Sequence, residues 1–217
     1  MKLYPSLSTF TCANLRPAVA TLAATTATLM TTFLPLPAQA LPPQVEWIKQ
    51  LAADGSNGVA TDGNGNVYIS GLTTDIKGNG DAWVAKYNSS GQLQWKQQLG
   101  TSSYDYSWGV TTDSNGSVYI SGFTEGALAG TNKGNGDAWV AKYNSSGKLQ
   151  WKQQLGSSSG DDSWGVTTDS SGNVYISGLT GGALAGKHKG NGGAFVAKYS
   201  QQSQPYQRAP KPLRQDR

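Results

Sequence analysis

Three acidic residues of this 217-residue sequence come nearest to the types and spacing needed for catalysis. Asp161 and Asp162 are adjacent and could imitate the carboxyl pair of a glycosidase, in which one carboxyl donates a proton and the other attacks or activates water. Asp105 lies 56 residues earlier, between Tyr104 and Tyr106, and no second acid accompanies it. Because the acids differ in this way along the chain, we predict no catalytic residue and a protein that is not an enzyme.

Residues that bind metals or cofactors are sparse. His188 is the single histidine and Cys12 is the single cysteine. The sequence has no Gly-x-Ser-x-Gly motif, no His/Cys cluster and no phosphate-binding loop that ends in Lys-Ser/Thr. We therefore predict neither a cofactor nor a metal site.

Three short acidic turns need a separate interpretation. Asp62-Gly-Asn-Gly-Asn66 looks like part of a calcium loop, but an EF-hand loop needs a glutamate at its twelfth position, where this chain has Thr73. The alternative is a hairpin turn in which the Asp side chain accepts backbone N–H groups and a glycine three residues later takes a positive φ. Asp113 and Asp169 recur in the same pattern, and we interpret all three as turns.

The net charge of +4 belongs to the ends of the chain. Lys2 and Arg16 lie in the first forty residues, and four basic residues face one aspartate in the last ten. The body between them carries a charge of about −1, so the composition gives no case for nucleic-acid binding.

The first forty residues have the composition of a signal peptide. They contain no glycine, residues 17–37 carry no charge, and Ala38-Gln39-Ala40 provides small residues at the spacing of a cleavage site. We predict cleavage after Ala40 and a secreted, periplasmic or extracellular protein. An uncleaved membrane anchor is the alternative, but Pro35 and Pro37 make this segment a poor spanning helix.

Residues 201–217 contain three prolines and four basic residues, and we predict a disordered tail.

The body consists of three copies of one unit. Trp95 and Trp151 each begin Trp-Lys-Gln-Gln-Leu-Gly, and Val-Tyr-Ile-Ser-Gly occurs at 67–71, 118–122 and 174–178. The copies span about 45–94, 95–150 and 151–200. Each copy is predicted to form four short strands, called A to D, because β-branched and aromatic runs alternate with Gly/Asn/Ser turns. The fold class is thus all-β, a propeller-like array of three four-stranded blades and 12 strands.

These motifs resemble the SBBP type of β-propeller repeat found in exported bacterial proteins. The resemblance rests on Trp-x-x-x-Leu-Gly, Val-Tyr-Ile-Ser-Gly and Asp-Ala-Trp-Val-Ala-Lys-Tyr, and it covers residues 45–200. It implies a propeller and an extracytoplasmic setting, but no catalytic residue or ligand. Propellers typically have four to eight blades, so three copies depart from the pattern.

The order of strands bears on closure. A D-like strand, Val45–Leu51, precedes the first A strand, and Pro205 makes the segment after the last C strand a poor D strand. A closed ring would place Trp47 near Phe195, either in a strained three-bladed ring or in a six-bladed homodimer. An open array is the alternative.

The long connections of each copy, D–A and B–C, are predicted to lie at one end of the blades. Binding residues concentrate on such loops. The candidate binding residues of this long-loop face are Tyr104, Asp105, Tyr106, Trp108, Glu125, Asn132, Lys133, Asp161, Asp162, Trp164, Lys187 and His188. The tryptophans of strands C and D, by contrast, are expected to form the core between blades.

Two functions follow from these features. The first is an exported, non-enzymatic module that binds or scaffolds an unknown polymer or protein through the long-loop face. The alternative is a propeller enzyme, a lyase or hydrolase acting on polysaccharide, which would need ionisable groups converging from different blades.

Overall fold

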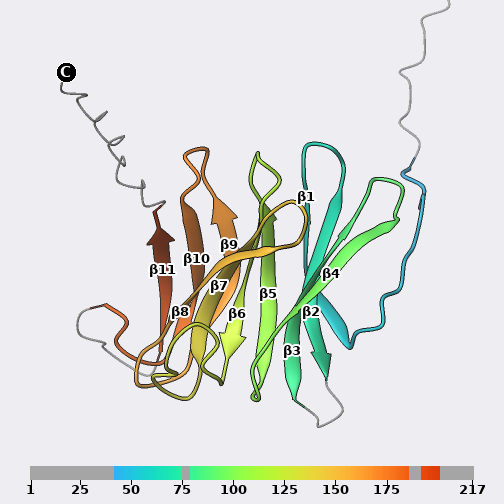
Figure 1. The fold of residues 1–217 in the computed structure, drawn as a ribbon. Helices are drawn as coiled ribbons and strands as arrows, with labels where there is room; N and C mark the ends of the chain where they lie inside the picture. Colours follow the sequence, from blue (N-terminus) through green and yellow to red (C-terminus); the bar gives the residue numbers. More distant parts are fainter. Residues whose placement is uncertain (1–41, 75–78, 186–191, 201–217) are drawn as a thin grey trace, which may run out of the picture. The chain divides into compact units, whose positions relative to one another are not determined.

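The computed structural model describes residues 42–74, 79–185 and 192–200. All the described strands lie after Gln44, between Gly55 and Tyr199 (Figure 1). Lys187, His188, the predicted signal peptide and the predicted tail lie outside the described residues.

Eleven antiparallel strands form three sheets in the described part of the chain. Sheet 1 has the order β1-β2-β3-β4, sheet 2 has the order β5-β6-β7-β8, and sheet 3 has the order β11-β10-β9. Each sheet is a meander, as the repeat pattern predicts. The strands are β1 (Gly55–Thr61), β2 (Val67–Thr74), β3 (Gly80–Tyr87), β4 (Leu93–Leu99), β5 (Asp105–Thr112), β6 (Val118–Thr124), β7 (Asp137–Tyr143), β8 (Leu149–Leu155), β9 (Asp161–Thr168), β10 (Val174–Thr180) and β11 (Gly193–Tyr199).

Two expectations about the strands need correction. Residues 45–51 do not form a strand, so the twelfth predicted strand is missing from the described residues. Within one chain, Trp47 stacks on Tyr87 of sheet 1 instead of lying near Phe195, as a three-bladed ring would require. The physical reason is that a strand needs a neighbouring strand to accept and donate its backbone hydrogen bonds, and this segment has none among the described residues.

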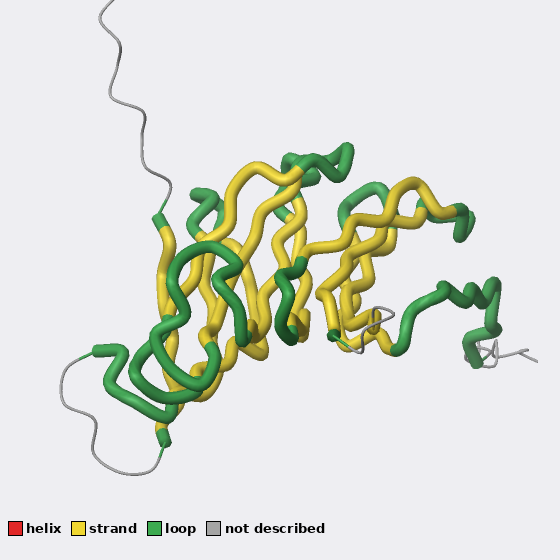
Figure 2. Tube along the Cα trace, turned by 60° about the horizontal axis from the view of Figure 1, so that its bottom comes forward, coloured by secondary structure: helices red, strands yellow, loops and turns green. Residues whose placement is uncertain are grey.

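The first strands of the sheets lie side by side, with β5 in contact with both β1 and β9. Side chains tie these strands together across the sheets: the Asn57 amide donates to the Ser107 carbonyl at 3.0 Å, and the Thr112 hydroxyl donates to the Thr61 carbonyl at 3.1 Å. Sheet 2 therefore lies between sheets 1 and 3. The longest described loops gather at one end of the strands (Figure 2).

Apolar side chains fill the space between neighbouring sheets. Tyr68 and Val84 of sheet 1 pack with Val118 and Trp139 of sheet 2, and Val140 of sheet 2 packs on the opposite side with residues of sheet 3. Trp139 is buried between sheets 1 and 2, as predicted for the core between blades, whereas Trp83 is buried on the other face of sheet 1, in a cluster with Ala85 and Tyr87. Sheet 2 is apolar on both faces because each face is covered by another sheet.

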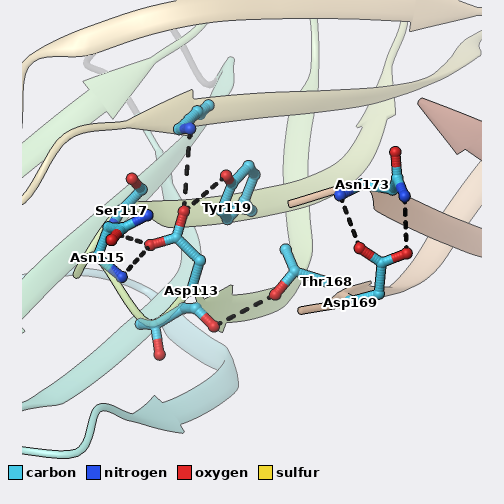
Figure 3. Close-up of polar contacts among 9 residues, drawn as sticks. Asp113, Asn115, Ser117, Tyr119, Thr168, Asp169 and Asn173 are labelled. Atoms are coloured by element: carbon cyan, nitrogen blue, oxygen red, sulfur yellow. Dashed lines mark hydrogen bonds and ion pairs between the residues drawn. The ribbon is translucent and has the colours of Figure 1, made fainter. Parts of the chain in front are cut away.

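The three acidic turns are hairpin turns, as predicted. In sheet 2 the Asp113 carboxylate accepts backbone N–H groups from Asn115 and Ser117 and the hydroxyl of Tyr119, all at 2.9 Å (Figure 3). The glycine three residues after the aspartate has a positive φ in each turn: 74° at Gly65, 74° at Gly116 and 78° at Gly172. These carboxylates thus hold the turns between strands A and B.

The described residues contain no helix, and hence none with the length and hydropathy to cross a membrane.

Candidate functional site

A pocket of about 370 Å³ lies where sheets 2 and 3 meet at the long-loop end. Its walls come from the start of β5, the end of β6, the start of β9 and the end of β10. Those strand ends adjoin the D–A and B–C loops, the side on which the sequence placed the binding residues. The lining residues are Tyr106, Trp108, Phe123, Gly160, Asp161, Asp162 and Leu179.

A row of three aromatic rings runs into this pocket along the start of β5. The rings of Tyr104 and Tyr106 lie 6.0 Å apart at an interplanar angle of 7°, and those of Tyr106 and Trp108 lie 5.7 Å apart at 8°. Phe123 on the neighbouring β6 lies 6.2 Å from Tyr106. Tyr106 and Trp108 are two residues apart, so the alternation of side chains along a strand places both on the same side. Trp108 is the extra residue of a bulge between Ser107 and Gly109.

Asp162 is one of the two aspartates that line the pocket. The Trp164 indole N–H donates to its carboxylate at 2.9 Å. Burial raises the pKa of Asp162 above its ordinary value, although the indole N–H groups of Trp164 and Trp108 oppose this change. The Trp108 N–H lies close enough to affect that pKa but forms no hydrogen bond, so Trp108 Nε1 and Asp162 Oδ1 are both buried without a hydrogen-bond partner.

Asp105 and Asp161 have a different role from the one predicted. Asp105 is fully buried, and its carboxylate accepts the backbone N–H of Thr101 at 2.6 Å and the Thr101 hydroxyl at 2.9 Å. Asp161 is 1% exposed and makes the same two bonds with Ser157, at 2.6 and 2.8 Å. Both carboxylates hold the loop before strand A. Asp105 is therefore not at the surface, whereas Asp161 lines the pocket although it is almost fully buried.

The other predicted residues lie beside the pocket or away from it. Trp164 is 56% exposed, on a face of sheet 3 that no other described sheet covers. Glu125 and Asn132 belong to the loop between β6 and β7, where the Asn132 amide donates to the Glu125 carbonyl at 2.7 Å. The Lys133 backbone N–H donates to the Asp137 carboxylate. The structure does not bring these three loop residues into the pocket.

Phe123, Gly160 and Leu179 were missed by the sequence analysis. Phe123 and Leu179 occupy the same position of the repeat, directly after Val-Tyr-Ile-Ser-Gly, where the first copy has Leu72. This position faces the start of strand A, so its apolar character in all three copies was the signal that could have added it to the site. The described residues hold no group of three or more His, Cys, Asp or Glu side chains arranged to bind a metal ion.

Comparison with known proteins supports the repeat pattern. The family described as SBBP, beta-propeller repeat, matches three segments, residues 46–79, 94–128 and 150–184. Each segment runs from strand D of one unit to the end of strand B or the loop after it in the next. No curated protein matches the sequence. A solved structure of a protein of unknown function from Bacteroides caccae is similar at 13% identity and a TM-score of 0.30, over 56% of this chain; this chain spans about half, 52%, of that one.

Proposed function

This chain belongs to the SBBP beta-propeller repeat family, and from that premise we propose that it is an exported, non-enzymatic module that binds a polysaccharide in the pocket between sheets 2 and 3. The observation that carries the proposal is the row of near-parallel rings at Tyr104, Tyr106 and Trp108, which leads into a pocket lined by two aspartates, Asp161 and Asp162.

The aromatic row suits a sugar polymer for a physical reason. A pyranose ring presents C–H groups on its faces and hydroxyls around its edge, so it packs on flat aromatic surfaces while it keeps its polar groups hydrated. Tyr and Trp also have few rotatable bonds, so contact with them costs little side-chain entropy. Tyr104 is 41% exposed and forms the open end of the row, which leaves room for a chain longer than one sugar.

The polar atoms of the pocket suit a hydroxyl. Trp108 Nε1 is a donor and Asp162 Oδ1 is an acceptor, and neither has a protein partner. A sugar hydroxyl can accept from the first and donate to the second, which would satisfy two buried polar groups whose isolation costs free energy. A neutral polymer fits better than an acidic one, because the body of the chain has little net positive charge to attract an anion.

The binding experiment compares the wild type with Trp108→Asn by affinity electrophoresis in gels containing a neutral β-glucan, a neutral α-glucan or a polyuronate. The first copy has Asn57 at the equivalent position, where its amide bonds the next sheet, so asparagine is compatible with the fold. We expect one neutral glucan to retard the wild type and W108N to lose at least about tenfold in affinity, because stacking and a donor are both removed.

Leu93→Asn is the matched control, since Leu93 is 48% exposed on β4 and outside the pocket. It should bind like the wild type. Equal mobility of the wild type in all gels, or equal binding by W108N, would contradict the proposal.

Export is a separate part of the proposal and rests on residues 1–40, which lie outside the described residues. Mass spectrometry of the protein from the culture medium or periplasm should find Leu41 as the first residue. A protein that retains Met1 would contradict it.

One observation favours an enzyme as the second candidate: the raised pKa of Asp162, which burial produces in a pocket and which is typical of a general acid. Measuring new reducing ends, and the absorbance of unsaturated products, after incubation with the same polymers separates the two candidates. We expect no turnover. Turnover that Asp162→Asn abolishes would establish a hydrolase or lyase instead.

A further inference from the structure

The segment before the first strand lies on the outer face of sheet 1, the face turned away from sheet 2. The Trp47 indole N–H donates to the Ser89 carbonyl at 3.2 Å, and its ring stacks on Tyr87 at 6.5 Å and an interplanar angle of 24°. Leu51 and Ala53 pack against the cluster of Trp83, Ala85 and Tyr87. The segment therefore has side-chain contacts although it has no strand partner.

Those contacts are the ones that a fourth strand makes on the next sheet. Trp95 of β4 donates its indole N–H to the Ser145 carbonyl at 3.2 Å, 56 residues after Ser89. The ring of Trp95 lies over Gly147 as that of Trp47 lies over Gly91, at 2.8 and 2.9 Å from the position of an added Cβ. Trp151 and Leu155 of β8 pack on the core of sheet 3 in the same way. Residues 47–51 thus occupy the place of a fourth strand, although the described residues contain no sheet to which this strand could belong.

Sheet 3, by contrast, has no fourth strand among its described residues. Its last described strand, β11, pairs with β10 alone, so its other edge is open in the described residues. Residues 201–217, which would follow, contain no tryptophan and three prolines. The face of sheet 3 that points away from sheet 2 is also open: Val196 is 74% exposed, whereas the equivalent Val84 and Val140 are fully buried.

The glycines of strand A also differ in whether they face a neighbouring sheet. A Cβ on Gly58 would lie 3.0 Å from the Trp108 carbonyl of sheet 2, and a Cβ on Gly109 would lie 3.2 Å from the Trp164 carbonyl of sheet 3. A Cβ on Gly165 would meet only the Ser177 hydroxyl of its own sheet. On the outer face of sheet 1, Val59 is 70% exposed, whereas its equivalent Val110 is 9% exposed. The outer face of sheet 1 and the face of sheet 3 that points away from sheet 2 are thus both open, and each has the residues that pack against a neighbouring sheet elsewhere in the array.

We propose that two copies of this chain join head to tail in a closed ring of six blades, in which residues 45–51 of each copy form the fourth strand of sheet 3 of the other. Residues 45–51 cannot pair with sheet 3 of their own chain, because sheet 2 separates sheets 1 and 3. Two copies give six blades, within the usual range of propellers, and two-fold symmetry repeats the same interface twice. The interface lies away from the pocket between sheets 2 and 3, so this proposal does not depend on the proposed function.

The repeat also fixes the register of the new pairing. Within sheet 1, Lys86 pairs with Trp95 and Ala85 pairs with Lys96. The equivalent pairs are Lys198 with Trp47 and Ala197 with Ile48 of the second copy. In sheet 1 the Lys96 ammonium lies 5.3 Å from the centre of the Trp83 ring. The new pairing replaces that lysine by Ile48 and that tryptophan by Phe195, which explains why Ile48 is apolar although it is 77% exposed in the single chain.

The first experiment tests the register by disulfide formation, with Cys12 replaced by Ser. Ile48→Cys combined with Ala197→Cys places both thiols on one face of adjacent strands, within reach of a disulfide. We expect a covalent dimer on a non-reducing gel. Ile48→Cys combined with Val196→Cys is the matched control and should stay monomeric, because a shift of one residue turns the second thiol to the other face. Equal cross-linking of both pairs, or of neither, would overturn the register.

The second experiment measures the solution mass by light scattering. The wild type should have twice the mass of the chain, and Val196→Asp should have the mass of one chain, because a charge cannot be buried unpaired in the interface. Leu93→Asp places the same charge at an exposed site outside the interface and should remain dimeric. A monomeric wild type, a larger oligomer, or a dimer that V196D leaves intact would overturn the proposal.

Discussion

Sheets 2 and 3 contain almost the same strands but differ in how deeply these strands are buried. The third strand of sheet 2, Asp137–Tyr143, is buried at every position except Lys142, whereas Gly193–Tyr199 in sheet 3 alternates between half-buried and exposed. Both strands have the sequence Ala-(Trp/Phe)-Val-Ala-Lys-Tyr after their first residue. The repeat therefore encodes a strand with two apolar faces. The position of its sheet, between two sheets or at the end of the array, decides whether both faces are covered.

The largest expected effect is the difference in stability between replacing Trp139 and replacing Trp164. Trp139 is fully buried and donates its indole N–H to the Phe123 carbonyl at 2.9 Å, whereas Trp164 is 56% exposed. In the Val196→Asp background, which keeps the copies apart, Trp139→Ala should lower the free energy of unfolding by about 3–5 kcal/mol, and Trp164→Ala by less than about 1 kcal/mol. Urea unfolding followed by circular dichroism measures both. Similar losses would mean that the open face of sheet 3 is packed in solution.

A smaller effect is expected at the glycines of strand A. An added Cβ at Gly109 would lie 3.1 Å from the Ser121 hydroxyl and 3.2 Å from backbone atoms of Trp164 and Val166, so Gly109→Ala should cost about 1–2 kcal/mol. Gly165→Ala should be nearly neutral when Val196→Asp keeps the copies apart. Thermal melting of the two variants in that background measures the difference. In the wild-type background, the same G165A change should weaken the dimer, since Gly165 then faces a second copy.

The smallest effect concerns the acidic turns at low pH. Hydrogen bonds, chiefly from the Asn173 side chain, lower the pKa of Asp169 to about 2. Burial raises the pKa of Asp113, but hydrogen bonds from Ser117, Tyr119 and Asn115 outweigh it and leave the pKa below its ordinary value. A lowered folded-state pKa stabilises the fold above pH ~4, and this stabilisation is lost as the pH falls toward 2.

The melting temperature should therefore fall between pH ~4 and 2, and both Asp169→Asn and Asp113→Asn should reduce this slope. Asn keeps an oxygen that accepts the turn N–H groups but does not titrate. The pKa of Asp169 is lowered to about 2, so D169N should change the slope more than D113N. Unchanged slopes in both variants would show that other groups control the acid transition.

The sequence predicts what is local. The Asp113 turn depends on residues within six positions, and Asp, Gly and Tyr stand at the same offsets in all three copies, so one pattern was enough. The order of strands A to D follows from the same short turns. Trp139 was assigned to the core because an aromatic residue that recurs at one strand position packs between sheets.

The sequence does not predict contacts that depend on distant chain segments. Residues 45–51 have the pattern of a strand, but a strand exists only where another edge pairs with it. Asp105 and Asp161 were assigned to the surface because charged residues are usually exposed, whereas each accepts two bonds from the loop four residues before it. The recurrence of a hydroxyl residue at Thr101 and Ser157, each four positions before the acid, was a signal that could have shown this role.

The strands β4 and β8 are both Leu-Gln-Trp-Lys-Gln-Gln-Leu, and the strands they pair with are identical from Asp81 to Tyr87 and from Asp137 to Tyr143. A folding chain therefore has no energetic way to tell one strand from the other by its own side chains. Only the length of the loop that carries each strand directs it to its own sheet, since short loops close at a smaller entropic cost. Refolding at high protein concentration should yield strand-exchanged species, and one substitution that makes β4 and β8 unlike should reduce their yield.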